Sequence, residues 1–354
     1  MNRRTAMVTA PPSRQASDRV LEVEQLSVEI DGPAGALRAV TGVDLHVGRG
    51  ETLCIVGESG CGKTMTSLGI MGLLPRRARL SARRLALEGC DLLALGAGER
   101  AALRGNRMAM IFQDPMTSLN PVYTVGNQME EIFLRHHKGG RNEARERAEY
   151  LLQKVGITAA RSRLGQYPHQ LSGGLRQRVM IAMALMCEPI LMIADEPTTA
   201  LDVTIQAQIL HLLADLQKEY RMALMLITHD LGVVARMADR VVVMYAGQVV
   251  ETGTAEQVFT APLHPYTRGL LDCIPVPGKT LRGSKLGSIP GMVPSLIGPI
   301  AGCQFRNRCA HAFDACTAAP VPLRTLGPDH QSRCLLDEAP APRLSYPASA
   351  EAGR

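Results

Sequence analysis

Aromatic side chains are scarce in this sequence, and their scarcity limits what the protein can bind. The 354 residues include no tryptophan, seven tyrosines and five phenylalanines, and no Phe or Tyr precedes Phe112. The net charge is only +6, and the basic residues form no long run. Because single-stranded nucleic acids bind to stacking aromatic side chains in basic grooves, this composition argues against a nucleic-acid partner.

Long apolar runs are missing as well. The most apolar stretch, residues 179–195, is divided by Glu188 and Pro189 into two pieces that are too short to cross a bilayer. The first 19 residues lack the apolar core of a secretory signal, and we expect a disordered tail there. These features predict a soluble cytoplasmic protein, with a second flexible tail at residues 339–354.

Apolar strands alternate with helical patterns along most of the chain. The predicted strands are several short, half-exposed ones within 20–50, then 52–56, 107–112, 190–195, 223–228 and a hairpin over 240–253. The predicted helices are 63–74, 122–137, 141–155, one that begins after Ser172, 204–220 and 231–239. Within the third helix, Glu143 and Arg147 are spaced to form an ion pair. This alternation predicts an α/β fold with a mainly parallel sheet covered on both faces.

One glycine-rich loop has the pattern of a phosphate site. GESGCGKT, residues 57–64, fits G-x-x-x-x-G-K-[ST] and lies between a predicted strand and a predicted helix. In such a loop the backbone N–H groups surround phosphates, Lys63 reaches the β and γ phosphates, and Thr64 can bind Mg²⁺. The loop residues assigned to nucleotide binding are Gly57, Glu58, Ser59, Gly60, Cys61, Gly62, Lys63 and Thr64. Cys61 is expected to be incidental to the chemistry.

Two carboxylates follow the buried strand at 190–195. Asp195 ends that strand, which places its carboxylate beside the phosphate loop, where it can hold Mg²⁺ directly or through water. Glu196 points differently and could activate a water molecule for attack on the γ phosphate. An Asp-Glu pair at the end of a strand is weak evidence by itself, but here it accompanies a phosphate loop.

A second helix start in the chain also suits a phosphate group. In LSGGLRQR, residues 171–178, Ser172 is a good N-cap, and Gly173 and Gly174 leave backbone N–H groups open at the positive end of the helix dipole. Apolar residues follow three or four apart, with Arg176, Gln177 and Arg178 expected on other faces of the helix.

These motifs, in this order, resemble the full set of an ABC-type ATPase. The set is GESGCGKT, IFQDP (111–115), LSGGLRQR, LMIADEP (191–197), ALD (200–202) and ITHD (227–230), and it spans roughly residues 20 to 260. The resemblance implies a P-loop NTPase with a RecA-like parallel sheet, an antiparallel β subdomain and a helical subdomain at about 116–180. It also implies ATP and Mg²⁺ as ligands.

The resemblance assigns roles to further residues. Gln113 would sense Mg²⁺ and the attacking water and contact a membrane partner. His229 would contact the γ phosphate, and Asp202 would lie in the loop that faces the opposite subunit. The catalytic set is then Glu196, His229 and Gln113, and the Mg²⁺ set is Thr64, Gln113 and Asp195. Ser172, Gly173 and Gly174 would face the γ phosphate held by a second ATPase subunit, head to tail.

The sequence departs from the family pattern at the adenine site. In the family an aromatic residue before the first glycine-rich turn usually stacks on adenine, but the matching stretch LSVEIDGPAG offers Ile30. Adenine would have to pack on aliphatic groups, so we expect a weaker or less base-selective pocket.

A narrower resemblance covers nearly the whole chain. FQDPMTSLNP (112–121), YPHQLSGG (167–174), LHPYTRGLL (263–271) and the tail with SIPGMVPSL and GCQFRNRCAHAFDAC look like the ATPase subunits of dipeptide and oligopeptide importers. The resemblance implies an ATPase domain at 20–262 and an importer-type C-terminal domain at 263–338. The implied partners are a second ATPase, favoured to be a paralogue, two membrane permeases and an extracytoplasmic peptide-binding protein, with this chain peripheral on the cytoplasmic face of the membrane.

Four of the nine cysteines lie close together in the Gly- and Pro-rich region after residue 263. Cys303, Cys309, Cys316 and Cys334 have the spacing C-x5-C-x6-C-x17-C, which is neither a zinc-ribbon nor a ferredoxin pattern. By spacing alone, buried structural cysteines and a metal site are both open. The importer resemblance favours a 4Fe–4S cluster on these four cysteines, with zinc as the runner-up and a structural role. His311 and His330 are read as solvated.

Two alternative functions are a soluble ABC ATPase and an importer of a non-peptide substrate. A soluble ABC ATPase without a membrane partner would usually carry two ATPase units or a long coiled coil, and neither pattern is present in the sequence. An importer of glutathione or a metal chelate is the other alternative, because a motor subunit does not itself touch the transported substrate.

Overall fold

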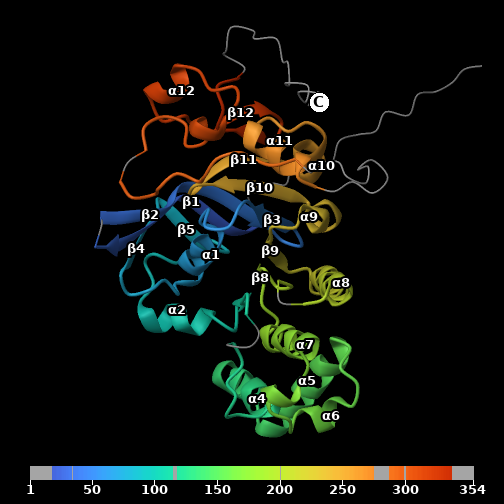
Figure 1. The fold of residues 1–354 in the computed structure, drawn as a ribbon. Coiled ribbons are helices and arrows are strands. Elements are labelled where there is room, and N and C mark those ends of the chain that lie inside the picture. Colours follow the sequence, from blue (N-terminus) through green and yellow to red (C-terminus); the bar gives the residue numbers. More distant parts are fainter. Residues whose placement is uncertain are drawn as a thin grey trace, which may run out of the picture.

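The computed structural model describes residues 18–336, except positions 34, 115–117, 200, 275–286 and 299. The tails expected at 1–19 and 339–354 therefore lie outside the described residues, apart from positions 18 and 19. Among the described residues, no helix combines the length and the apolar character that a membrane span requires. Figure 1 shows the fold, with the strands in the upper half and a group of helices below them.

An eight-stranded sheet forms the centre of the molecule. Its strand order is β12-β13-β11-β10-β3-β9-β8-β7. The bounds are β3 Thr52–Val56, β7 Met108–Ile111, β8 Leu191–Asp195, β9 Ala223–Ile227, β10 Arg240–Tyr245, β11 Gln248–Thr254, β12 Arg324–Gly327 and β13 His330–Ser332. The five strands from β10 to β7 are parallel to one another, and β11, β13 and β12 continue the sheet with antiparallel pairs. This arrangement confirms the predicted parallel core and the hairpin.

Both faces of this sheet are covered, because successive residues of its central strands enter different cores. In β3, Leu53 and Ile55 belong to one apolar cluster, whereas Cys54 and Val56 belong to the other. All five residues of β3 are buried, as are those of β8 and β9. A strand buried on both faces has no polar alternation, which is why these segments appear in the sequence as continuous apolar runs.

An antiparallel sheet covers one face, and its strands correct a prediction. The stretch 20–50 forms two 14-residue strands, β1 Arg19–Gly32 and β2 Gly35–Gly48, and the short half-exposed strands predicted there are wrong. Gly42 lies inside β2 with a φ of 58°, where the pairing register with β1 shifts, so this glycine marks a bulge and not a strand end. The other strands are β4 Ala78–Ser81, β5 Arg84–Leu87 and β6 Cys90–Asp91.

Helices account for the rest of the ATPase fold. Those of the lower group in Figure 1 are α4 Val125–His136, α5 Arg141–Lys154, α6 Ala160–Arg163 and α7 Gly173–Ala184, with the 3-10 turn η2 Pro168–Gln170. Those nearer the sheets are α1 Lys63–Met71, α2 Ala97–Leu103, α8 Val203–Tyr220 and α9 Leu231–Met237. α1 ends three residues earlier than predicted, because Gly72 takes the left-handed conformation at φ 65° and caps the helix.

Two details of the helices differ from the sequence predictions. Arg147 pairs with Glu188 at 2.8 Å in place of the expected partner Glu143, because the end of α7 brings Glu188 next to α5. Gln177, which the sequence places on a face of α7 other than the apolar one, is only 1% exposed. The reason is that α7 contacts α4, α5, α8 and β7 and is therefore buried on more than one face.

The chain after residue 254 returns to the upper part of the molecule. Its elements are α10 Ala255–Thr260, α11 Pro265–Asp272, η3 Arg306–Arg308, α12 Ala315–Ala318, β12 and β13. The carboxylate of Glu251, fully buried, accepts the N–H groups of Leu263 and His264 and contacts His330 Nε2 at 2.8 Å. His330 is thus a buried partner of β11, and its prediction as a solvated residue is wrong. The division of the chain at about residue 263 stays a prediction.

Candidate nucleotide site

The phosphate loop joins β3 to α1, and its glycines are required by close backbone contacts. A Cβ atom at Gly57 would lie 2.2 Å from the carbonyl oxygen of Met244, and one at Gly62 would lie 2.4 Å from that of Ala39. Both glycines also have positive φ, of 150° and 101°. The loop therefore approaches its neighbours so closely that only glycine fits at these positions.

Lys63 is held at the base of this loop. The residue is only 5% exposed, and its ammonium donates to the carbonyl oxygens of Gly57 at 2.8 Å and Glu58 at 3.1 Å. Cys61 is buried beside it, with Sγ 3.8 Å from Nζ, and burial raises the pKa of the thiol above its usual value. The buried thiol therefore stays protonated at neutral pH, and the absence of a chemical role for Cys61 stays a prediction.

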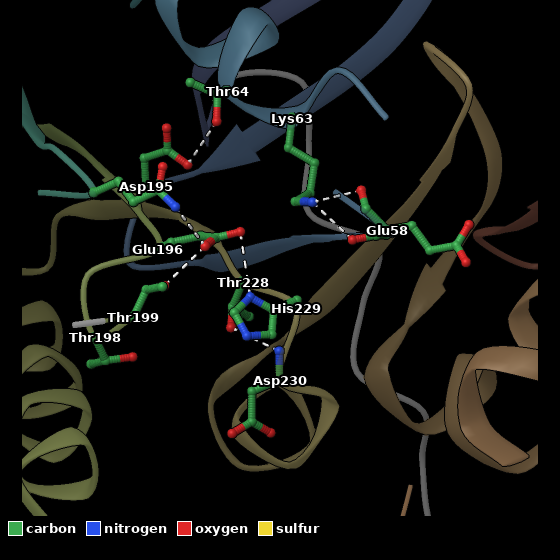
Figure 2. A network of polar contacts seen from close by, with 12 residues as sticks. Glu58, Lys63, Thr64, Asp195, Glu196, Thr198, Thr199, Thr228, His229 and Asp230 are labelled. Carbon is green, nitrogen blue, oxygen red and sulfur yellow. Dashed lines mark hydrogen bonds and ion pairs between the residues drawn. The ribbon is translucent and has the colours of Figure 1, made fainter. Parts of the chain in front are cut away.

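Asp195 and Thr64 meet at the other end of the loop. Thr64 Oγ1 donates to Asp195 Oδ1 at 3.3 Å (Figure 2). Asp195 is 2% exposed at the end of β8, and burial raises its pKa. A hydroxyl and a carboxylate oxygen on one side of a phosphate loop are the donors that Mg²⁺ prefers, so these residues fit the ion.

Glu196 is the centre of a group of polar contacts. Its carboxylate accepts a hydrogen bond from Gln113 Nε2 at 3.0 Å. It also accepts one from Thr199 Oγ1 at 2.9 Å, and His229 Nδ1 lies 3.4 Å from its Oε1 (Figure 2). The structure thus brings together the three predicted catalytic side chains. Thr199 was not among the predicted site residues, although it follows Glu196 in the same DEPTT motif.

The backbone at Glu196 is unusual. Its φ of 45° lies in the left-handed region, which a residue with a side chain rarely adopts. The N–H of Glu196 donates to the carbonyl of Ile227, so the strand end of β9 holds this conformation. Strain of this kind is found at functional sites. The side chains of Glu196 and Asp195 point in different directions (Figure 2).

The second helix start, at α7, has the predicted cap. Ser172 Oγ accepts the N–H of Leu175 at 3.4 Å. A Cβ at Gly174 would come within 3.0 Å of Ile205, so this glycine allows α7 to approach the start of α8. Ser172 and Gly173 are exposed, as is Asp202 at the N-terminus of α8.

A pocket of about 230 Å³ opens beside the phosphate loop. It is lined by Ile30, Leu37, Ala39, Ser59, Gly60, Gly62, Lys63, Thr64, Met65, Gln113, Glu196 and Leu296. Ser172, Gly173, Gly174 and Asp202 do not belong to this lining. Within the described residues, the structure therefore separates the predicted nucleotide residues into the loop group and the α7 group.

Two residues of the C-terminal region, Tyr266 and Arg308, form hydrogen bonds to the phosphate loop. The hydroxyl of Tyr266 accepts the N–H of Glu58 at 2.8 Å, and the guanidinium of Arg308 binds both carboxylate oxygens of Glu58, at 2.6 and 3.0 Å. Arg308 also donates to the carbonyls of Pro290 and Ile289. The sequence predictions missed Tyr266 and Arg308, because their partner is more than 200 residues away and no spacing rule connects them.

The four C-terminal cysteines lie near one another as free thiols. The N–H of Cys303 donates to the carbonyl of Cys316 at 2.7 Å, and burial, with the other cysteines nearby, raises the pKa of Cys309 to about 11. Over the part of the chain that the structure describes, no three His, Cys, Asp or Glu side chains are placed to bind a metal ion. The predicted 4Fe–4S or zinc site thus has its ligands in one region but not in a ligating arrangement.

Fold and site together define a P-loop ATPase, since the parallel sheet presents the phosphate loop after β3 and the carboxylates of Asp195 and Glu196 at the end of β8. Family models agree: residues 40–199 match "ABC transporter", and residues 250–316 match "Oligopeptide/dipeptide transporter, C-terminal region".

Two curated relatives are similar to this protein over almost the whole length of the chain. The chain is 50% identical to the dipeptide transport ATP-binding protein DppD of Escherichia coli K12 over 327 residues, which are 92% of this chain and 99% of that protein. It is 49% identical to the oligopeptide transport ATP-binding protein AppD of Bacillus subtilis, covering 90% and 97%. Among solved structures, the ATP-binding cassette MJ0796 in a dimer with ADP and Pi has a TM-score of 0.59 at 26% identity, covering 66% of this chain and 98% of that one. The chain therefore belongs to the family of ABC transporter ATP-binding subunits of dipeptide and oligopeptide importers, and it is an ATPase.

Proposed function

We propose that this protein is the ATP-hydrolysing motor subunit of a membrane importer for dipeptides or oligopeptides. The observation that carries the proposal is the similarity to peptide-importer subunits, which extends through both the ATPase fold and the C-terminal region. The assembled hydrolytic group of Glu196, Gln113 and His229 supports an active motor.

Hydrolysis follows from the geometry of that group. The loop N–H groups and Lys63 bind the phosphates. Thr64 and Asp195 would hold Mg²⁺, and the ion would supply positive charge to the phosphate oxygens. Glu196 takes a proton from the attacking water. Gln113 and Thr199 orient the carboxylate of Glu196, and His229 lies where it can contact the γ phosphate.

A second ATPase subunit, favoured to be a paralogue, completes the site. Ser172, Gly173 and Gly174 begin α7 at the surface, apart from the chain's own loop pocket. In a head-to-tail dimer this helix start binds the γ phosphate held by the partner's loop, and Asp202 faces the partner. ATP binding then closes the dimer, and hydrolysis opens it.

The permease partners dock beside Gln113. An apolar groove of about 330 Å³ lies between the core sheet and the helical group, and its lining includes Phe112, Met110, Leu119, Met180 and Met183. Phe112 is 40% exposed and precedes Gln113, so movement of the Gln113 loop at the γ phosphate reaches the groove directly. In this proposal the protein works at the cytoplasmic face of the membrane, with two permeases and an extracytoplasmic binding protein in the complex.

The C-terminal cysteines hold a 4Fe–4S cluster in this proposal. The support is that four free cysteines, Cys303, Cys309, Cys316 and Cys334, lie in one region with short elements and little periodic structure, where a bound metal would add folding energy. Their side chains would have to move into a ligating arrangement when the cluster binds. Anaerobic purification should yield brown protein with about four irons per chain. Colourless protein with stoichiometric zinc would favour the runner-up, and protein with neither metal would leave the cysteines as packing residues.

Transport by the complete complex tests the function. The chain is combined with its partner ATPase and permeases in liposomes, and ATP-dependent uptake of labelled dipeptides and oligopeptides is measured with the binding protein present. We expect uptake that stops when Glu196→Gln is used. Uptake of glutathione or a metal chelate without peptide uptake would contradict the substrate class. ATPase activity that does not respond to the permeases would favour a soluble ATPase.

A further inference from the structure

A segment of the C-terminal region reaches the nucleotide pocket. Leu296 is one of the pocket's lining residues, although it is more than 230 residues from the phosphate loop in sequence. Its carbonyl accepts the N–H of Arg38 at 2.9 Å, and Ile297 forms an antiparallel bridge with Leu37. The segment is therefore attached to β2 by backbone hydrogen bonds, which fix the position of Leu296.

The pocket has a polar end and an apolar end. Lys63, Thr64, Gln113 and Glu196 line the polar end. Ile30 and Leu37, which face each other across the β1–β2 pair, lie with Leu296 at the other. A nucleoside triphosphate is divided in the same way, into a charged phosphate chain and a flat base with apolar faces. With the phosphates on the loop, the base lies against the aliphatic side chains.

We propose that Leu296 is a base-binding residue and that the C-terminal region is a structural part of the ATP site. Ile30, Leu37 and Leu296 hold the faces of the purine in place of the aromatic side chain that β1 lacks. This inference rests on the ATPase activity alone and does not depend on which substrate is transported.

A second attachment supports the same assignment. Tyr266 and Arg308 bind Glu58 in the phosphate loop, and the side chain of Arg308 is only 4% exposed. Arg308 also donates hydrogen bonds to the carbonyl oxygens of Pro290 and Ile289, which lie in the same segment as Leu296. The C-terminal region thus contacts the phosphate loop through Tyr266 and Arg308, and it lines the apolar end of the pocket through Leu296. The relative position of the polar and apolar ends of the pocket therefore depends on the C-terminal region.

The three aliphatic side chains also determine how well the pocket distinguishes one nucleotide base from another. None of them carries a hydrogen-bonding group, and an apolar wall discriminates poorly between bases that differ only in polar substituents. We therefore expect kcat/KM for ATP and GTP to agree within about tenfold.

Binding of ADP and of pyrophosphate separates the base from the phosphates, and neither ligand is hydrolysed. In the full-length chain, Leu296→Ala should raise the Kd for Mg²⁺-ADP about five- to tenfold, because apolar area against the base is lost, and should leave the Kd for pyrophosphate unchanged. Met292→Ala is the matched control, since Met292 lies in the same segment, is 88% exposed and does not line the pocket. Leu296→Met keeps the apolar volume and should bind both ligands like the wild type.

Two results would overturn the proposal. An unchanged Kd for ADP in Leu296→Ala would remove Leu296 from the base site. An equal rise for ADP and pyrophosphate would show that the substitution acts by displacing the phosphate loop. Thermal unfolding of each variant checks that the comparison is made on folded protein.

Discussion

The two helix starts that suit phosphate, at α1 and α7, differ in how much of the chain surrounds them. Lys63 is buried within the loop before α1, and Asp195 contacts Thr64 at the end of that loop. Tyr266 and Arg308 bind the loop at Glu58. The start of α7 has its own N-cap, but Ser172 and Gly173 are exposed. One site is thus built by its own chain, whereas the other is an exposed surface that a second subunit covers in the proposed dimer.

This difference shows what each motif contributes. Residues around the α1 loop act on the nucleotide bound by this chain, so their substitution should affect hydrolysis or ATP affinity directly. Residues at the start of α7 should affect only the closed dimer. The predictions below separate the two sites, from the largest expected effect to the smallest.

Glu196→Gln should have the largest effect. It removes the general base but keeps the hydrogen bonds that an amide oxygen can accept, so kcat should fall by about 10²- to 10⁴-fold while the Kd for ATP stays the same. The measurement is single-turnover hydrolysis alongside equilibrium binding, with the partner subunit present. Asp215→Asn, at an exposed carboxylate on α8, is the control and should hydrolyse ATP normally. Normal turnover in Glu196→Gln would mean that another group takes the proton.

Ser172→Arg tests the α7 site. A long cation at the exposed helix start removes the cap and obstructs the partner's phosphates, so hydrolysis should fall by about a hundredfold. ATP binding to the isolated chain should not change, and ATP-dependent dimerisation, followed by light scattering, should be lost. Thr158→Arg, on an exposed position of the same helical group, is the control. A weaker ATP affinity in the isolated chain would contradict the separation of the two sites.

Arg308→Gln tests the outer support of the loop. Without the guanidinium, the Glu58 carboxylate loses its partner and becomes a free negative charge near the phosphates, so KM for ATP should rise about tenfold with a smaller change in kcat. Adding Glu58→Gln removes that charge and should restore KM. The control is Arg240→Gln, which breaks the Arg240–Glu51 pair away from the loop and should affect stability more than KM. Failure of the double variant to recover would indicate a purely structural role for Arg308.

Acid pH should destabilise the region around Tyr266, which contacts the phosphate loop at Glu58. His264 is buried and neutral, accepts the N–H of Tyr266 at Nδ1, and burial lowers its pKa to about 3. Because the unfolded chain binds a proton near pH 6.5 and the folded chain does not, the free energy of unfolding should fall as the pH drops from 6.5 towards 3, by about 1 kcal/mol per pH unit. Urea unfolding between pH 7 and 5 measures this slope.

His264→Asn isolates the contribution of that residue. Asparagine keeps a hydrogen-bond acceptor at the N-cap of α11 but does not titrate, so the slope of stability against pH should become shallower. His211→Gln, at an exposed histidine on α8, should leave the slope unchanged. An unaltered slope in His264→Asn would assign the acid sensitivity to other groups.

Local patterns predicted most of the central fold. The buried strands at 52–56, 190–195 and 223–228 and the long helix over 204–220 were found because their signals are contiguous apolar runs or a regular 3.6-residue period. The sequence of 20–50 predicts short strands there, because glycines interrupt its apolar alternation. Gly42 is in fact a bulge within β2, and only the pairing with β1 reveals that.

The sequence by itself determined the chemistry of this protein. Gly57, Lys63, Asp195 and Glu196 are recognisable because phosphate and Mg²⁺ chemistry requires particular residues at short spacings after a strand. Tertiary structure alone decided which contacts support that chemistry. Thr199 and Gln113 donate hydrogen bonds to Glu196, and Arg308 and Tyr266 bind Glu58. Leu296 lines the apolar end of the nucleotide pocket. The physical reason is distance along the chain. A contact between residues 58 and 308 leaves no periodic trace in sequence, because it exists only when the sheet and the C-terminal region pack against each other.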